Sequence, residues 1–361
     1  MRVLVVNTGS SSVKLRLLEP DDSVVWRHDE PALPELSDEE FSQLLSEAPE
    51  ADAVGHRVVH GGEQFTGPTL IDDTVLDQLA ALADLAPLHQ PPALRAARLA
   101  RAAWPGRPHV ACFDTSFHRT LPAAAETYAV PETWRKAYPI RRYGFHGLSH
   151  AWAARRAPEL TGGPVSRLVT CHLGAGSSLS AVLDGTCVDT TMGFTPLEGL
   201  VMATRSGDVD PGLVLWLIRR AGLSPEEVEH KLVHESGLLG LSGHADMRTV
   251  TNLADAGEQD AELAIEVYLH RLRAGIAAMC ASLGGLDTLA FTGGVGEHDW
   301  QIRSRAVAGL AFLGVRLDAA ANKDARPDAD LTAETSTARV LLIEAREDQE
   351  IARDARTLLE G

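Results

Sequence analysis

Short apolar runs that end in a polar residue and a Gly/Ser-rich turn recur along this chain. One unit consists of Arg2–Asn7, the turn Thr8–Ser12 and a second apolar run, Val13–Leu18. The same order of run, turn and run returns much later, at Arg167–His172, Leu173–Ser178 and Leu179–Asp184. Each copy predicts a β-hairpin. Further β-like segments follow the two copies, at Val24–His28 and Thr186–Thr190. A hairpin plus a third strand, present twice, predicts two related sheets, and the spacing is too long for a solenoid.

Apolar residues at helical spacing fill most of the remaining chain. They predict helices at Asp73–Leu85, Pro92–Trp104, Leu148–Ala157, Pro211–Ala221, Pro225–Glu235, Ala261–Leu283, Trp300–Leu313 and Asp348–Leu359. Apolar strands precede several of these helices, at Pro108–Phe113, Asp287–Thr292 and Arg339–Ile343. Strands that alternate with helices predict an α/β architecture with buried central strands. The Pro- and acid-rich segment Glu30–Glu50 is expected to be a surface excursion with one short helix.

Length and charge narrow the class of protein. A chain of 361 residues exceeds what one hydrophobic core normally supports, which predicts two domains. With 50 acidic against 33 basic residues, the formal charge is −17, which argues against nucleic acid or an anionic membrane as the main partner. The four cysteines form no C-x-x-C pair, and no apolar stretch is long enough for a signal peptide or a membrane span. A cytoplasmic protein with reduced thiols is therefore expected.

The Gly/Ser turns are candidate phosphate sites. Thr8–Ser12 and Gly174–Ser178 bring backbone amides and hydroxyls together without bulky side chains, which suits phosphate oxygens. Either turn alone is more typical of an ordinary hairpin. Two matched copies, together with a third Gly-rich turn at Thr292–Glu297, favour nucleotide binding. The chain lacks G-x-x-x-x-G-K-[ST] and G-x-G-x-x-G, so it is not a P-loop protein.

A series of motifs makes the sequence recognisable. They are VLVVNTGSSSVK (Val3–Lys14), GHRVVHGG (Gly55–Gly62), LAPLHQPP (Leu85–Pro92), FDTSFH (Phe113–His118), YGFHGLSH (Tyr143–His150), CHLGAGSS (Cys171–Ser178), MGFTPLEG (Met192–Gly199) and GGVGE (Gly293–Glu297). In this order, from Met1 to Arg353, they resemble the signature set of the acetate kinase family. The resemblance implies an α/β fold of two ribonuclease H-like domains (a duplicated βββαβαβα unit) with an interdomain cleft, as in the acetate and sugar kinase/actin superfamily.

The resemblance also implies the domain limits and the partners. The N-terminal domain would cover 1–115 plus a returning helix at 349–361, and 116–348 would form the nucleotide-binding and dimerisation domain. The implied reaction is a Mg²⁺-dependent, direct in-line phosphoryl transfer between ATP and acetate, giving ADP and acetyl phosphate, with Mn²⁺ as an alternative ion. The protein would be a homodimer that acts on these small molecules, with neither nucleic acid nor a membrane as partner.

Phosphoryl transfer needs cations and hydrogen-bond donors around the migrating group. By resemblance, the catalytic residues are Arg57, Asp114, His146 and Arg205. The two arginines would hold the acetate carboxylate and the phosphoryl group, because a guanidinium binds such anions bidentately. His146 and Arg205 would stabilise the transition state. A buried core histidine remains the alternative for His146.

Oxygen ligands for Mg²⁺ are implied at Asn7 and Glu347, together with Asp114. A helix cap remains the alternative role for Glu347, since a helix is predicted directly after it. Ser10 and Ser12 would lie near the phosphate, and His89 and His118 are expected to be positioning groups.

The resemblance further implies a small apolar pocket for the acetate methyl group. Its residues would be Val59, Leu88, Phe145 and Pro196, next to Arg57. One added methylene changes such a preference by only about 1–3 kcal/mol, so propionate is expected to be a weaker substrate.

The implied nucleotide-binding residues fall in four motifs. They are Lys14, His172, Leu173, Gly174, Ala175, Gly176, Asp246, Met247, Arg248, Gly293, Gly294, Val295, Gly296 and His298. Small residues at Gly293–Val295 leave room for a purine. Ala175 and His298 stand where the family commonly has Asn, a departure that concerns nucleotide affinity more than reaction type.

Other classes remain as alternatives. His230 and His234 lie at i, i+4, but a zinc protease needs Glu at the position of Lys231. Gly147–Ala151 has the outline of a nucleophile elbow without the apolar strand that should precede it. The two serious rivals are a noncatalytic actin-like nucleotide-binding protein and a kinase for propionate or butyrate.

Overall fold

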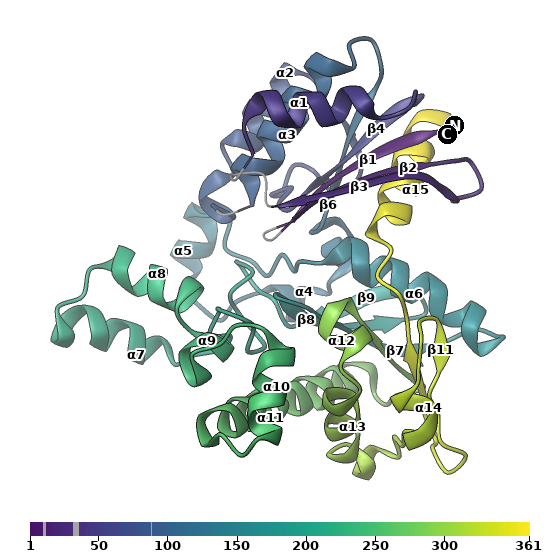
Figure 1. The fold of residues 1–361 in the computed structure, drawn as a ribbon. Helices are drawn as coiled ribbons and strands as arrows, with labels where there is room; N and C mark the ends of the chain where they lie inside the picture. The colour runs from purple at the N-terminus through teal and green to yellow at the C-terminus, as the bar shows by residue number, and fades with distance from the viewer. Residues whose placement is uncertain (10–11, 32–35, 88) are drawn as a thin grey trace. The chain divides into compact units, whose positions relative to one another are not determined.

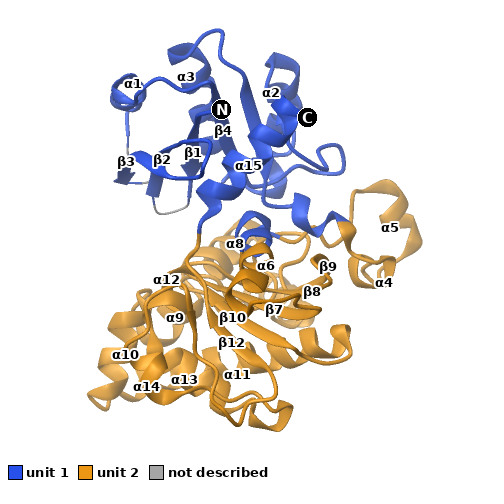
Figure 2. Ribbon diagram, turned by 90° about the vertical axis from the view of Figure 1, so that its right-hand side faces the viewer, with its two compact units in different colours: residues 1–119, 145–152, 346–361 blue, residues 120–144, 153–345 orange. Residues whose placement is uncertain are grey.

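The computed structural model describes residues 1–9, 12–31, 36–87 and 89–361 (Figure 1). The chain forms two compact units, each with its own sheet and core, which Figure 2 shows in different colours. Unit 1 comprises residues 1–119, 145–152 and 346–361, and unit 2 comprises residues 120–144 and 153–345. The domain limits expected from the sequence, 1–115 plus 349–361 and 116–348, stay a prediction.

Unit 1 contains a six-stranded sheet in the order β3-β2-β1-β4-β6-β5. The strands are β1 (Val3–Thr8), β2 (Ser12–Leu18), β3 (Val24–Pro31), β4 (Ala53–Val58), β5 (Thr69–Leu70) and β6 (His109–Phe113). Strand β1 pairs antiparallel with β2 and parallel with β4, which in turn pairs parallel with β6. The longer helices of this unit are α1 (Asp38–Glu47), α2 (Asp73–Ala80), α3 (Gln90–Ala103), α15 (Glu347–Glu360) and the start of α6 (Gly147–Thr161).

The alternation of side chains along β1 explains why helices cover both faces of this sheet. Leu4 and Val6 pack in one cluster with residues of α1 and α3. Val3 and Val5 pack in another with residues of α15. In β4, a Cβ on Gly55 would lie 2.6 Å from the side chain of Ile351, so α15 can approach the sheet only because this position is glycine.

Unit 2 repeats this arrangement. Its sheet order is β11-β12-β10-β7-β8-β9, which read from the other end matches that of unit 1 strand for strand. The strands are β7 (Arg167–Leu173), β8 (Ser177–Leu183), β9 (Thr186–Thr190), β10 (Thr288–Thr292), β11 (Ala329–Asp330) and β12 (Arg339–Leu342). The same strand order in both units confirms the duplication predicted from the repeated hairpins.

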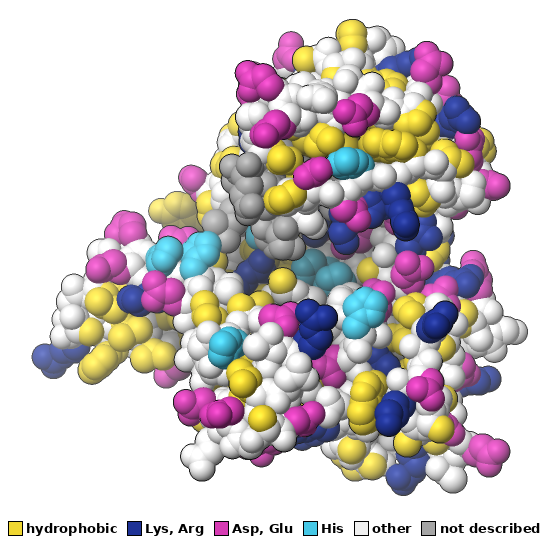
Figure 3. All heavy atoms as spheres, in the orientation of Figure 1, with side chains coloured by type: hydrophobic (Ala, Val, Ile, Leu, Met, Phe, Trp, Pro, Cys, Tyr) yellow, Lys and Arg dark blue, Asp and Glu magenta, His cyan; other side chains and the backbone are white. Residues whose placement is uncertain are grey.

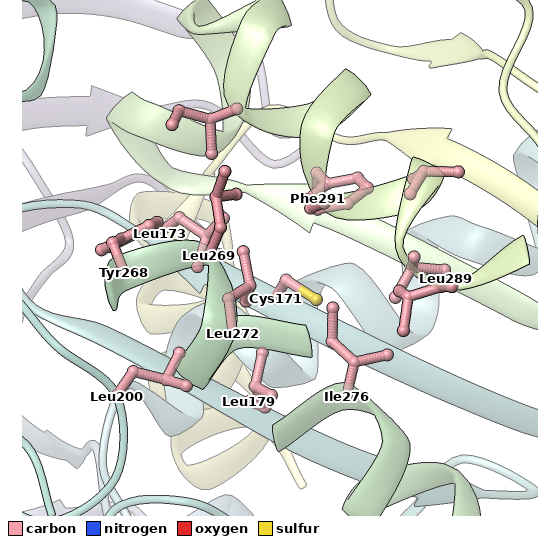
Figure 4. Packing of buried hydrophobic residues seen from close by; sticks show 14 of the residues in the cluster. Cys171, Leu173, Leu179, Leu200, Tyr268, Leu269, Leu272, Ile276, Leu289 and Phe291 are labelled. Atoms are coloured by element: carbon pink, nitrogen blue, oxygen red, sulfur yellow. The ribbon is translucent and has the colours of Figure 1, made fainter. Parts of the chain in front are cut away.

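Unit 2 also contains several helices besides the second part of α6. They are α4 (Ala123–Glu126), α5 (Glu132–Ala137), α7 (Pro211–Trp216), α8 (Pro225–His234), α9 (Gly237–Ser242), α10 (Met247–Asp255), α11 (Gln259–Leu283), α12 (Gly293–His298), α13 (Trp300–Ala308) and α14 (Ala319–Lys323). Alternate residues of β7, such as Cys171 and Leu173, pack against Leu269, Leu272 and other residues of α11 (Figure 4). This core supports the strands whose ends carry the candidate nucleotide residues.

The structure confirms the α/β class and the predicted helices, with shifted ends. The segment Thr292–Glu297 was expected to be a turn. That expectation was wrong, because Gly293–His298 form the short helix α12 with Thr292 as its N-cap. The apolar pattern did not predict strands β4, β5 and β11 or helices α4, α5, α9, α10 and α14. Within the described residues, no helix combines the length and the apolar character that crossing a membrane requires.

Candidate active site

Three polar side chains stand at the carboxyl ends of neighbouring parallel strands in unit 1. By the alternation along β1, β4 and β6, Asn7, Arg57 and Asp114 face the same side of the sheet, the side covered by α15. Glu347 is the first residue of α15. Ligand sites in α/β sheets gather at such strand ends. The topology therefore brings together four residues that lie far apart in the sequence.

The four side chains form one hydrogen-bonded cluster. Arg57 donates from Nη2 to Asp114 Oδ2 at 2.7 Å and from Nε to the same oxygen at 3.1 Å. Its Nη1 lies 3.4 Å from Asn7 Oδ1 and 3.6 Å from Glu347 Oε2. Asn7 Nδ2 donates to Glu347 Oε2 at 2.8 Å. The guanidinium is thus fixed in orientation by contacts on several sides. Glu347 is the first residue of α15 and also contacts Asn7 and Arg57.

The net charge of this cluster favours the binding of a further cation. Burial raises the pKa of Asp114 to about 6, although Arg57 acts in the opposite direction. Burial alone would lower the pKa of Arg57, but Asp114 and Glu347 raise it above its ordinary value. Two carboxyl groups face one guanidinium, so the ionised cluster carries one more negative than positive charge. A divalent cation would relieve this excess.

His146 lies at a strained turn next to this cluster. It has φ 55°, which is unusual for a residue other than glycine, and its carbonyl accepts from the His150 amide at the start of α6. The following amide, of Gly147, donates to the Asp114 carbonyl at 2.9 Å. A Cβ on Gly147 would lie 2.1 Å from that oxygen. The turn that presents His146 is therefore tied to Asp114, and such strain is typical of functional sites.

Of the predicted acetate pocket, the structure places Val59 and Phe145 in unit 1, both buried. The Phe145 ring packs edge-on against His60, the residue after Val59, with ring centres 5.5 Å apart. His118 Nε2 lies 2.9 Å from the Phe145 carbonyl oxygen, and the positioning role of His118 stays a prediction. Leu88 and Ser10 lie outside the described residues.

Arg205 and Pro196 lie together in unit 2. Arg205 Nη1 donates to the Pro196 carbonyl at 2.9 Å and lies 3.8 Å from the sulfur of Met202. The Arg205 side chain is buried, with 9% of its surface exposed. The guanidinium is therefore held by the loop that carries the fourth predicted pocket residue.

Most of the candidate nucleotide residues of unit 2 line one cavity of about 490 Å³. From the predicted set, the lining includes Gly174, Ala175, Asp246, Met247, Arg248, Gly294, Val295 and His298. His172 borders the turn, since a Cβ on Gly174 would lie 3.6 Å from His172 Nε2. A Cβ on Gly294 would meet nothing within 4 Å, so this position is open toward the cavity. The volume suits a drug-sized or nucleotide-sized ligand.

Some predicted nucleotide residues do not line this cavity. Lys14 belongs to unit 1, where it pairs across the β-hairpin with Asn7. Leu173, Gly176, Gly293 and Gly296 are not among its lining residues, and a Cβ on Gly293 would lie 2.8 Å from the Leu173 carbonyl.

Sequence reasoning missed part of the lining. The additional residues are Thr251, Asn252, Asp299, Trp300 and Gln301, from α10 and the start of α13. An N-capping signal could have found α10, and it also marks the start of α13, which was predicted. The Asp246 side chain accepts from the Thr249 amide, and Asp299 accepts from the Gln301 and Ile302 amides. Each Asp stands directly before its helix. The cap at Asp246 was overlooked because no helix was predicted after it.

Two sheets of one strand order, a nucleotide-sized cavity and a buried arginine–carboxylate cluster fit a phosphotransferase with two α/β units. The acetokinase family model matches residues 30–353, and the chain belongs to this family. It is 43% identical over 393 residues to an acetate kinase of Leifsonia xyli subsp. xyli, covering 98% of both chains. It is 40% identical over 400 residues to an acetate kinase of Thermoanaerobacter pseudethanolicus, with 100% of both covered.

Solved structures of kinases with similar folds match the chain over almost its whole length. The acetate kinase of Porphyromonas gingivalis has a TM-score of 0.89 at 33% identity, covering 99% of both chains. A propionate kinase from Francisella tularensis subsp. tularensis has a TM-score of 0.90 at 34% identity, covering 98% of both. The chain is accordingly an enzyme with acetate kinase activity, which transfers a phosphoryl group between ATP and acetate. The noncatalytic alternative is thereby set aside.

Proposed function

We propose that the reaction is a direct, in-line, Mg²⁺-dependent transfer in which Arg57, Asp114, His146 and Arg205 are the catalytic residues. The observation that carries this proposal is the cluster that fixes Arg57 against Asp114, Asn7 and Glu347. Acetate and the γ-phosphoryl group are both anions, so their approach requires cations that are already oriented. In a chain with a net charge of −17, such cations must be supplied locally.

Each residue then has a defined task. Arg57 and Arg205 bind the carboxylate and the phosphoryl oxygens, and His146 donates a hydrogen bond to the phosphoryl group as charge develops on it. Val59 and Phe145 of unit 1 and Pro196 of unit 2 are the described residues that we assign to the acetate methyl group. Leu88 is assigned with them from the family resemblance. The cavity of unit 2 binds ATP or ADP.

Mg²⁺ fits the oxygen donors of unit 1. We assign it to Asp114, Glu347 and the amide oxygen of Asn7, since carboxylate and amide oxygens are its preferred protein ligands and the cluster has excess negative charge. When bound, the ion neutralises charge on the phosphate oxygens. Mn²⁺ prefers the same donors and should replace it.

One assay tests the proposed reaction. Purified protein is incubated with ATP, Mg²⁺ and acetate, propionate or butyrate, and acyl phosphate is trapped with hydroxylamine. We expect acetyl hydroxamate, less propionyl hydroxamate, and none when Mg²⁺ is replaced by EDTA. A folded preparation that forms no acetyl hydroxamate contradicts the proposal, and a higher rate with butyrate or propionate changes the assigned substrate.

We further propose a homodimer in the cytoplasm. Apolar side chains gather on the surface of α7 (Figure 3), where Leu213, Leu215 and Trp216 are 45%, 49% and 56% exposed. A patch of this kind marks a protein interface, and a second copy of the chain is the partner that the family resemblance implies. Light scattering should give the mass of a dimer, and Trp216→Glu should shift it to a monomer. The four cysteines are free and buried, as expected in a reducing compartment.

A further inference from the structure

The loop Thr191–Gly199 follows β9 and carries Pro196, whose carbonyl accepts from Arg205. Buried apolar side chains hold the loop near its two ends, at Met192 and Leu200, and the Phe194 ring packs against the buried Tyr143 ring, with ring centres 6.1 Å apart. Residues 194–199 between them are all partly exposed. The segment from Thr195 to Gly199, which includes Pro196, therefore has no fully buried side chain of its own.

Polar contacts from a separate part of unit 2 hold the middle of this loop. Tyr128 donates to Glu198 Oε2, and its hydroxyl oxygen accepts from the Phe194 amide at 2.9 Å. Arg142 pairs through Nη2 with Glu198 Oε1 at 2.5 Å. Arg142 also donates from Nη1 to the carbonyls of Thr191 and Met192, at 3.1 and 3.0 Å. One phenol and one guanidinium thus bind the loop at four of its residues.

The packing leaves little freedom for another arrangement. A Cβ on Gly193 would lie 1.6 Å from Glu198 Oε2 and 2.0 Å from the Tyr128 hydroxyl, so only glycine lets the loop close over this pair. The Arg142 guanidinium also lies 5.5 Å from the centre of the Tyr128 ring. Burial and the Glu198 carboxylate raise the pKa of Tyr128 above its ordinary value, so the phenol stays protonated and donates.

We propose that Tyr128, Arg142 and Glu198 are positioning residues for acetate, which act by fixing the loop that carries Pro196 and, through the Pro196 carbonyl, the Arg205 guanidinium. The inference rests on the proposed roles of Pro196 and Arg205. Tyr128 and Arg142 contact Glu198. The backbone of the loop connects Glu198 to Pro196, and the Pro196 carbonyl accepts from Arg205. A shift of the loop would therefore move both the methyl pocket wall and the cation that binds the anionic groups.

The test is Tyr128→Phe, which removes one hydroxyl and leaves Glu198 Oε2 and the Phe194 amide without this partner. We expect the KM for acetate to rise about tenfold, with a smaller fall in kcat and with the KM for ATP changed less than about twofold. The ratio of kcat/KM for propionate to that for acetate should rise about threefold or more, because a displaced Pro196 widens the pocket. A general loss of stability would not change this ratio.

Tyr138→Phe is the matched control, because Tyr138 lies in the same unit and its side chain is 62% exposed. It should keep all these constants. Glu198→Gln keeps the shape but removes the charge that Arg142 pairs with, and it should shift the same constants in the same direction. This variant decides the question if Tyr128→Phe does not fold.

Folded Tyr128→Phe and Glu198→Gln enzymes with wild-type KM for acetate and an unchanged substrate ratio would overturn the inference. Failure of the proposed function gives a different result. In that case the unmodified protein forms no acetyl hydroxamate, or Arg205→Ala retains full turnover.

Discussion

In the proposed mechanism, Arg205 is a residue whose effect depends on where a single cation is held. Its guanidinium is buried and is fixed by the carbonyl of Pro196, so little reorganisation is needed when an anion binds. Arg57 is held in a comparable way by Asp114. An ammonium group at either position would be a point charge without the fork that binds two oxygens.

Arg205→Ala should lower kcat by about a hundredfold or more, since a transition-state cation is lost, while ATP binding is largely retained. Arg205→Lys should recover only part of the rate. Hydroxamate formation measures turnover, and calorimetric titration with ATP measures binding. Turnover within about tenfold of the wild type in the alanine variant would remove Arg205 from the catalytic set.

Individual site residues differ in how visible they were in the sequence. Asp114 follows a continuous apolar strand, and Asn7 ends another, so the strand ends alone indicated them. Arg57 lies in β4, whose residues AVGHRV break the apolar pattern, and only the motif resemblance pointed to it. The contact between Asn7 and Glu347 spans 340 residues, which no local pattern can predict.

Among the structural elements, α12 departs most from what local preference suggests. Three of its six residues are glycine, which is unfavourable in helices, and the sequence therefore predicted a turn. Tertiary contacts stabilise the helix instead. Glu297 accepts from the amides of Gly293 and Ala345 at 3.1 and 3.0 Å, and the buried Arg303 donates to the carbonyls of Gly296 and Glu297.

Gly293→Ala should specifically weaken nucleotide binding. Gly293 has φ 78°, and an added Cβ would lie 2.8 Å from the Leu173 carbonyl, so α12 must move away from β7. We expect the KM for ATP to rise about tenfold. Gly222→Ala is the control, because Gly222 has φ 73° with nothing within 4 Å, and it should cost only about 1 kcal/mol of stability. Equal KM values for ATP in both variants would contradict the assigned role of α12.

On the scale of the whole molecule, the distribution of buried histidines makes stability depend on pH. Burial lowers the pKa of His60, His109 and His118 from 6.5 to about 4, and that of His56 well below 6.5. All four belong to unit 1. The His56 and His109 rings stack, and His56 Nε2 lies 2.9 Å from His109 Nδ1. Positive charge on both rings would disrupt this contact.

Stability should therefore fall as the pH drops from about 6.5 toward about 4, because the unfolded chain binds protons that the folded histidines exclude. Each histidine contributes at most about 1.4 kcal/mol per pH unit. Burial raises the pKa of Asp114 and Glu297, so these two groups act in the opposite direction. They reduce the change of the unfolding free energy with pH but are outnumbered by the four histidines.

Urea unfolding at about pH 7.5 and about pH 5.5 measures this effect, and the midpoint should be lower at the acidic pH. His109→Asn offers a direct check, since the Asn side-chain oxygen can accept from His56 Nε2 in place of His109 Nδ1 while one titrating group is removed. Its midpoint should differ less between the two pH values than that of the wild type. Because the four histidines lie in one unit, a probe in unit 1 should report the acid-induced loss first. Midpoints that are equal at both pH values would show that the buried histidines do not control acid stability.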